Sequence, residues 1–111
     1  MNWNSLTDVS QLETIKEESF KQPVLILKHS KTCSISSTAL NRLERNWRQE
    51  KVGDLKPYFL DLLAHRPLSA QIAAIFDTEH QSPQVLLIKD GVCTYSATHF
   101  DISFAELEEE V

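Results

Sequence analysis

The chain lacks most features that mark a specialised class of protein. Its two cysteines, Cys33 and Cys93, are too few for a disulfide scaffold. No apolar run approaches the ~20 residues of a membrane span. The first residues, MNWNSLTD, have neither the basic start nor the apolar run of a signal peptide. We therefore expect no membrane partner and a reducing, cytoplasmic location, where a lone thiol is more often chemical than structural.

Positive charge is also scarce. The chain has 11 Lys and Arg against 16 Asp and Glu, which gives a formal net charge of −5. Several of the acidic residues gather at the C-terminal end, and no Lys/Arg cluster is present, so we expect no nucleic-acid partner. The 41% hydrophobic and 24% charged residues are typical of a globular protein. A length of 111 residues fits a single domain over 1–111 that folds without stabilising cross-links.

The most informative pattern follows Cys33. The apolar residues recur with a helical period that no strand would produce, at Ile35, Ala39, Leu40, Leu43 and Trp47. This spacing predicts an amphipathic helix that ends before Gly53. Thr32 is a good N-cap residue, which would make Cys33 the first helical residue. Free amide N–H groups and the helix dipole stabilise a thiolate there, so Cys33 is the candidate nucleophile. The alternative is a small buried core residue.

The remaining elements can be placed in chain order. We expect helices over 7–20 and from Leu68, and strands from Val24 and over 56–63. A hairpin of 84–89 and 92–97 should turn at Asp90-Gly91, before a last helix capped by Ser103 and Glu106. In the first helix, Ser10 and Glu13 fit a capping box, and the apolar face comprises Val9, Leu12, Ile15 and Phe20. The order α-β-α-β-α-β-β-α predicts an α/β fold, a mixed four-stranded sheet with helices on both faces.

This order, with a cysteine opening the helix after the first central strand and a proline before the hairpin, resembles the thioredoxin fold. The segments KHSKTCSIS, DLLAHRPLSAQIAAIF, HQSPQVLLIKDG and ATHFDIS together resemble the YtxJ family, the monothiol bacilliredoxins, over nearly the whole chain. That family is associated with removing bacillithiol, a small cysteine-containing thiol, from proteins that carry it as a mixed disulfide. Its usual motif is Thr-Cys-Pro-Ile-Ser, whereas Ser34 here replaces the proline that pre-sets a first helical turn.

The resemblance implies roles for several residues. Cys33 would attack the mixed disulfide, and the dithiol pattern would place a second cysteine where this chain has Ser36. A serine cannot resolve a disulfide, so the cycle would be monothiol. Ser36 would either hydrogen-bond the Cys33 sulfur or be an exposed helix-start serine. The Ser82-Pro83 bond would be cis, face Cys33 across a groove, and bind an extended client segment.

Other polar residues near the motif have two interpretations each. His29 could tune Cys33 or pass it a proton, or it could be an ordinary strand-end residue. Lys28 and Lys31 would add positive potential, although exposed lysines are screened. Asp61 could belong to the site or cap a turn, and the second interpretation is preferred.

Two further questions concern Cys93 and metal binding. Cys93 is expected to be a packed strand residue, because a resolving role would need its Cα within ~7 Å of that of Cys33. Three scattered histidines, His65, His80 and His99, have no Cys or carboxylate at metal-ligand spacing, so no metal site is proposed.

Four functions are compatible with these residues. The first removes bacillithiol, a co-substrate rather than a bound cofactor, from S-thiolated client proteins; a low-molecular-weight thiol or a disulfide reductase would then clear Cys33. The second uses glutathione, coenzyme A or free cysteine instead. The third is a redox-inactive binding module that uses the groove beside Pro83. The fourth, carriage of an iron–sulfur cluster, matches poorly, because monothiol glutaredoxins carry a glycine in the active loop where this chain has Ser34-Ile35.

Overall fold

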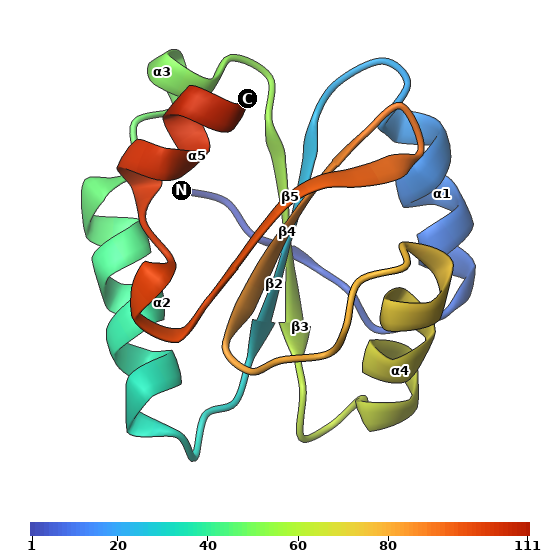
Figure 1. Cartoon of the computed structure of the whole chain (residues 1–111), viewed down its shortest axis with the longest axis horizontal. Coiled ribbons are helices and arrows are strands. Elements are labelled where there is room, and N and C mark those ends of the chain that lie inside the picture. Colours follow the sequence, from blue (N-terminus) through green and yellow to red (C-terminus); the bar gives the residue numbers. More distant parts are fainter.

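A computed structural model describes residues 1–111 and shows a five-stranded mixed sheet covered by helices on both faces (Figure 1). The strands are β1 (Asn4–Ser5), β2 (Val24–His29), β3 (Lys56–Asp61), β4 (Gln84–Lys89) and β5 (Val92–Thr98). The helices are α1 (Ser10–Glu18), α2 (Ser34–Asn46), α3 (Gln49–Val52), α4 (Arg66–Ile75), the 3₁₀ turn η1 (His99–Asp101) and α5 (Phe104–Glu110). The strand order is β1-β3-β2-β4-β5.

Strand β2 is the centre of the sheet, as its continuous apolar run predicts. Every residue from Val24 to His29 is buried. The strand pairs parallel with β3 and antiparallel with β4. A strand with apolar residues on both sides is stable only when both sheet faces are covered. The predicted central position is therefore confirmed.

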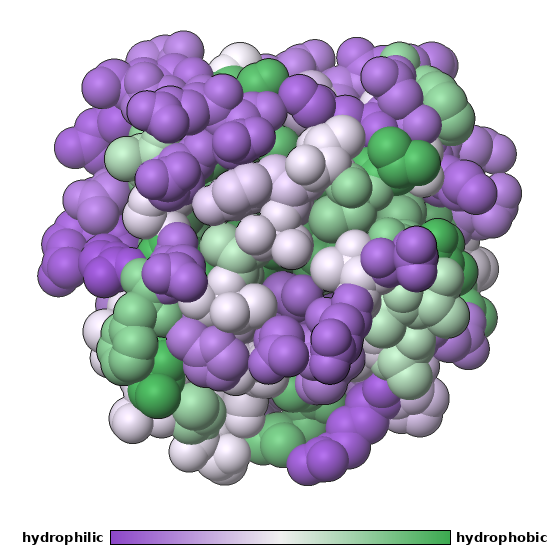
Figure 2. Space-filling view, viewed as in Figure 1, coloured by the Kyte–Doolittle hydropathy of each residue, from purple (hydrophilic) through white to green (hydrophobic).

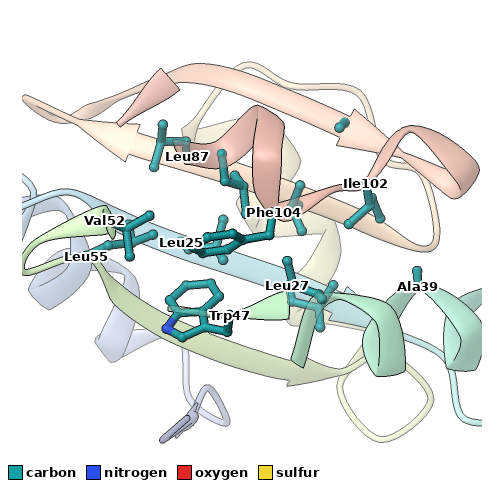
Figure 3. Close-up of a cluster of buried hydrophobic side chains, with 13 residues drawn as sticks. Leu25, Leu27, Ala39, Trp47, Val52, Leu55, Leu87, Ile102 and Phe104 are labelled. Carbon is teal, nitrogen blue, oxygen red and sulfur yellow. The ribbon is translucent and has the colours of Figure 1, made fainter. Parts of the chain in front are cut away.

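Alternate residues of β2 enter two separate cores. Leu25 and Leu27 belong to the core under α2, α3 and α5, whereas Ile26 belongs to the core under α1 and α4. In the first core the rings of Trp47 and Phe104 are 5.3 Å apart, which joins the end of α2 to α5 (Figure 3). This packing fixes α2, and with it the start of the Cys33 helix, against the sheet.

The prediction of four strands is short by one. The missed strand, β1, is only two residues long, and it pairs parallel with Tyr58 and Phe59 of β3. Both Asn4 and Ser5 are exposed, so they leave no alternation of apolar and polar residues in the sequence. The strand exists because β3 offers it a free edge.

The start of α1 differs from the predicted capping box of Ser10 and Glu13. The backbone N–H groups of Thr7 and Asp8 instead donate to Gln11 Oε1, at 2.7 and 2.9 Å. A glutamine inside the first turn thus reaches back to the preceding loop and replaces the predicted box.

The apolar face predicted for this first helix is half correct. Leu12 and Ile15 are buried, but Val9 is 47% and Phe20 62% exposed, because both lie outside the nine-residue helix.

Three other boundaries shift by a few residues. The helix predicted to reach Gly53 breaks at Trp47 and Arg48, which have extended backbones, and continues as α3. Strand β3 ends at Asp61 rather than at residue 63, and α4 begins at Arg66, before the expected Leu68.

The hairpin and the last helix follow their sequence signals. Asp90 and Gly91 both have positive φ, 53° and 81°, as a two-residue hairpin turn requires. Ser103 caps α5, since its Oγ accepts the Glu106 N–H at 3.2 Å. These predictions are confirmed.

None of the helices is long and apolar enough to cross a membrane. Figure 2 shows hydrophilic residues over the upper left of this face, where Figure 1 places α3 and the acidic α5. The acidic end of the chain therefore lies away from the point where β2 passes into α2, at the bottom of Figure 1.

Candidate functional site

Cys33 lies at the junction of β2 and α2, as predicted, but one position earlier in the helix. It has an extended backbone (φ −103°, ψ 118°) and is itself the N-cap residue, while Thr32 makes no capping bond. The Cys33 N–H donates to the Ser30 carbonyl at 3.1 Å, and its own carbonyl accepts the first helical bond, from Ser37. The predicted Thr32 cap is therefore wrong. The partly exposed thiol still lies beside the open N–H groups of a 13-residue helix.

Ser36 and His29 hold the loop in front of Cys33. Ser36 Oγ accepts the Ser30 N–H at 3.0 Å and lies 2.7 Å from His29 Nδ1. Ser36 is 1% exposed and makes no hydrogen bond to the Cys33 sulfur, so neither of its two predicted positions is correct. Because its oxygen already accepts the Ser30 N–H, its own O–H is free to donate to His29.

His29 is a buried, neutral partner in this arrangement. Burial lowers the pKa of His29, and the Asp61 carboxylate opposes the shift only in part. Its ring packs against Phe59 with centroids 5.4 Å apart. His29 therefore positions the loop through Ser36, and no hydrogen bond joins its ring to Cys33. This geometry favours the strand-end interpretation over direct proton transfer.

A groove of about 470 Å³ opens beside the thiol. Its lining includes residues from the Cys33 loop, from α4 and from the segment before β4: Thr32, Cys33, Arg66, Ser69, His80 and Ser82. A larger hollow of about 530 Å³ lies near Trp47 and Pro57, at the opposite end of the sheet, and contains no thiol.

The predicted cis bond before Pro83 is confirmed, and of the two residues Ser82 lines the groove. The Ser82-Pro83 peptide bond is cis, and Ser82 shares the groove with Cys33. Pro83 is buried, and its carbonyl accepts the His99 N–H at 3.1 Å. The Ser82 Oγ is also buried, yet no protein group bonds it. The hydroxyl of a residue that lines the groove is thus buried without a hydrogen-bond partner.

Lys28 is the main site residue that the sequence interpretation misplaced. It is fully buried rather than an exposed, screened cation. Its Nζ donates to the Ser69 carbonyl and to His80 Nδ1, both at 3.2 Å. Burial lowers the pKa of Lys28 to about 8. The burial of Lys28 could have been predicted from the sequence, because Lys28 continues the apolar run of a strand that is buried on both faces.

The other charged residues near the loop pair with each other. Lys31 Nζ lies 3.5 Å from Asp61 Oδ2, and the lysine side chain is 68% exposed. The Asp61 Oδ1 has no hydrogen-bond partner. Asp61 therefore pairs with the exposed lysine of the loop. Although burial opposes the shift, Lys31 and the backbone N–H groups of Ala64 and Leu63 lower the pKa of Asp61, which supports the preferred interpretation of a turn cap.

Cys93 lies at the other end of the sheet. It pairs with Ile88, and Ile88 pairs with Val24, the first residue of β2. Cys33 lies beyond His29, the last residue of that strand, and six residues of strand span roughly 17 Å. A disulfide needs Cα atoms within ~7 Å. Cys93 packs against the second core, as predicted for a strand residue, and cannot resolve an adduct on Cys33 without unfolding.

No group of three His, Cys, Asp or Glu side chains is placed to hold a metal ion. Of the predicted site residues, the structure brings Cys33, Thr32 and Ser82 to one groove. Ser36 and His29 do not line the groove; they are buried beneath the Cys33 loop. Sequence reasoning did not assign Arg66, Ser69 and His80 to the site. Arg66 and Ser69 reach the groove from α4, and His80 reaches it from the segment between α4 and β4.

Comparison with solved structures assigns the fold. A candidate oxidoreductase with a thioredoxin fold superposes with a TM-score of 0.81 at 31% identity, covering 96% of this chain and 90% of that one. Malassezia sympodialis thioredoxin superposes with a TM-score of 0.76 at 14% identity, over 98% and 90% of the two chains. Mitochondrial thioredoxin 3 from Saccharomyces cerevisiae gives 0.72 at 13%, over 96% and 91%. The fold and the helix-start cysteine define a thioredoxin-fold thiol oxidoreductase.

The family is more specific. Residues 4–107 match the family model described as monothiol bacilliredoxin BrxC. The chain belongs to this family, which agrees with the resemblance seen in its motifs and with the absence of a second cysteine beside Cys33.

Proposed function

We propose that this protein removes bacillithiol, or a similar low-molecular-weight thiol, from mixed disulfides on client proteins, with Cys33 as the nucleophile. The observation that supports this most directly is the position of Cys33. It is a partly exposed N-cap thiol in a groove shared with Ser82, and no second cysteine is within reach.

The first step is a thiol–disulfide exchange. The Cys33 thiolate attacks the sulfur of the small thiol, and the disulfide bond between that sulfur and the client breaks. The electron pair leaves on the client sulfur, which takes up a proton. The client is thereby reduced, and Cys33 now carries the small thiol as a new mixed disulfide.

The second step needs a thiol from outside the chain. Since Ser36 cannot attack a disulfide, a free low-molecular-weight thiol or a disulfide reductase supplies the two electrons that release Cys33. Without that external thiol, the adduct on Cys33 should accumulate as an intermediate. The proposal also includes S-thiolated clients, this reductant and a cytoplasmic location.

The test is transfer of the adduct. A client carrying bacillithiol as a mixed disulfide is incubated with wild type, Cys33→Ser and Cys93→Ser, and intact masses are followed. We expect wild type and Cys93→Ser to gain the mass of the small thiol while Cys33→Ser does not. Transfer that requires Cys93, or no transfer to wild type of any small thiol, refutes the proposal. The second result would leave a redox-inactive binding module.

A further inference from the structure

The groove beside Cys33 differs in charge from the rest of the molecule. The chain has a net charge of −5, yet no Asp or Glu lines this groove. Its only fully ionised lining side chain is Arg66, the first residue of α4. The acidic α5 lies on the other side of the sheet, at the upper left of Figure 1. A local positive field therefore faces the thiol in an acidic protein.

Lys28 adds a second positive charge directly behind the wall. Its Nζ donates to the Ser69 carbonyl and to His80 Nδ1, and both Ser69 and His80 line the groove. The ammonium is thus one residue away from the open space. Neither ion pair of the protein includes it: Lys31 pairs with Asp61, and Lys56 pairs with Glu18.

A buried ammonium without a carboxylate partner is unfavourable, because the charge loses its hydration and gains no opposite charge. With a pKa of about 8, Lys28 nevertheless carries its proton at neutral pH. His80 does not share this charge, since burial and the Lys28 ammonium lower its pKa. Since both hydrogen-bond partners of Lys28 belong to residues that line the groove, an anion bound there would lie close to its ammonium.

We propose that the groove binds an anionic remainder, such as a carboxylate, of the small thiol that Cys33 accepts, with Arg66 in contact and Lys28 attracting from behind Ser69 and His80. The proposal rests on the function proposed above and names the substrate class of the same site. A guanidinium is suited to this role, because it binds a carboxylate with two parallel bonds.

The test compares small thiols that differ in charge. One client peptide is prepared with 3-mercaptopropionate, 2-mercaptoethanol or cysteamine in the mixed disulfide, which gives an anionic, a neutral and a cationic remainder. Each transfer rate to Cys33 is divided by the rate of the same disulfide with N-acetylcysteinamide, so that intrinsic reactivity cancels. We expect wild type to prefer the anionic over the cationic remainder by roughly tenfold at low salt.

Two variants and two controls locate the preference. Arg66→Gln and Lys28→Met should each lower the ratio severalfold, whereas Arg45→Gln on α2 and Lys51→Met on α3, both exposed and outside the groove, should leave it unchanged. Arg66 is exposed, so its variant keeps the test valid even if Lys28→Met folds poorly.

The possible failures are distinguishable. If all three thiols transfer to Cys33 at equal normalised rates, or if the ratio survives both Arg66→Gln and Lys28→Met, this inference is refuted while the proposed function stands. If none of the three transfers, and bacillithiol does not either, both are refuted.

Discussion

The two ends of the sheet differ in how fully their polar groups are bonded. At the end that carries Cys93, Glu18 bonds Lys56 and Tyr58, and Ser19 Oγ accepts the Gly91 N–H at 2.8 Å. At the end that carries Cys33, the polar groups are less fully hydrogen-bonded. Asp61 Oδ1 and Ser82 Oγ have no partner, and Lys28 has no carboxylate.

Native proteins bond nearly all buried polar groups, so exceptions need a reason. Both cysteines are free and partly exposed, so exposure alone does not separate them. The Cys93 sulfur donates to the Tyr95 carbonyl at 3.3 Å within the hairpin of β4 and β5. Cys33 instead adjoins a helix start and a groove. Incomplete bonding therefore marks the end of the sheet that carries the proposed nucleophile.

The largest effect is expected from a second thiol at the Cys33 end. Ser36→Cys places a cysteine three residues after Cys33, the spacing of the dithiol pattern. Oxidation should then form a disulfide between Cys33 and the introduced thiol. A bound small thiol should leave at least about 100-fold faster without external reductant, because the attack becomes intramolecular. Intact mass and release of the small thiol measure both results.

Ser37→Cys is the matched control for that variant. Residue 37 lies about 100° further round the helix, so its thiol should not replace the external reductant. Equal behaviour of the two variants, or a disulfide to Cys93 in either, would contradict the difference between the ends.

The next effect concerns two lysines. Lys28→Met removes a buried charge without a carboxylate partner, so it should raise the free energy of unfolding at pH 7 by about 1–3 kcal/mol. Lys56→Met breaks the partly exposed pair with Glu18 and should lower it by about 0.5–1 kcal/mol. Urea unfolding measures both. If both variants changed the free energy of unfolding in the same direction, the two ends of the sheet would not differ in how their lysines are paired.

The advantage of Lys28→Met should depend on pH. Folded Lys28 has a pKa of about 8, whereas an ordinary lysine has a pKa of 10.5. Between these values the unfolded chain binds more protons, so the wild type gains stability relative to the variant as pH rises. The difference in unfolding free energy should therefore shrink from about pH 7 to about pH 10. A constant difference would mean that Lys28 is not desolvated when charged.

The smallest effect compares two serines. Ser19→Ala removes the acceptor for the Gly91 N–H and should lower the free energy of unfolding by about 1 kcal/mol. Ser82→Ala removes a hydroxyl without a partner and should change it by less than about 0.5 kcal/mol. Urea unfolding under identical conditions makes the comparison. A larger loss from Ser82→Ala would reveal a bond that holds the groove wall.

Local patterns in the sequence were sufficient for most of the fold. The apolar run from Val24, the helical stripe after Cys33 and the Asp90-Gly91 turn each specify an element by short-range rules. Strand β1 could not be predicted, because it depends on the free edge of β3 rather than on its own two residues.

The chemistry of the site was predictable only in part. The motifs, through the family that they resemble, point to Cys33, Ser82 and Pro83 as candidate residues. The groove is different, because it brings together Arg66 and Ser69 of α4 with His80 of the following segment only in the folded chain. The Ser36–His29 contact is likewise tertiary, which is why neither interpretation of Ser36 from the sequence, a bond to the sulfur or an exposed serine, included it.

The most direct test of the account is competition between the two thiols of one molecule. The native, reduced protein is treated with limiting iodoacetamide at about pH 7, and peptide masses give the fraction of Cys33 and Cys93 labelled over time, with the urea-unfolded chain as reference. We expect Cys33 to react at least about tenfold faster than Cys93 in the folded protein, and unfolding to remove the difference. Equal labelling of both cysteines in the folded protein, or faster labelling of Cys93, would contradict it.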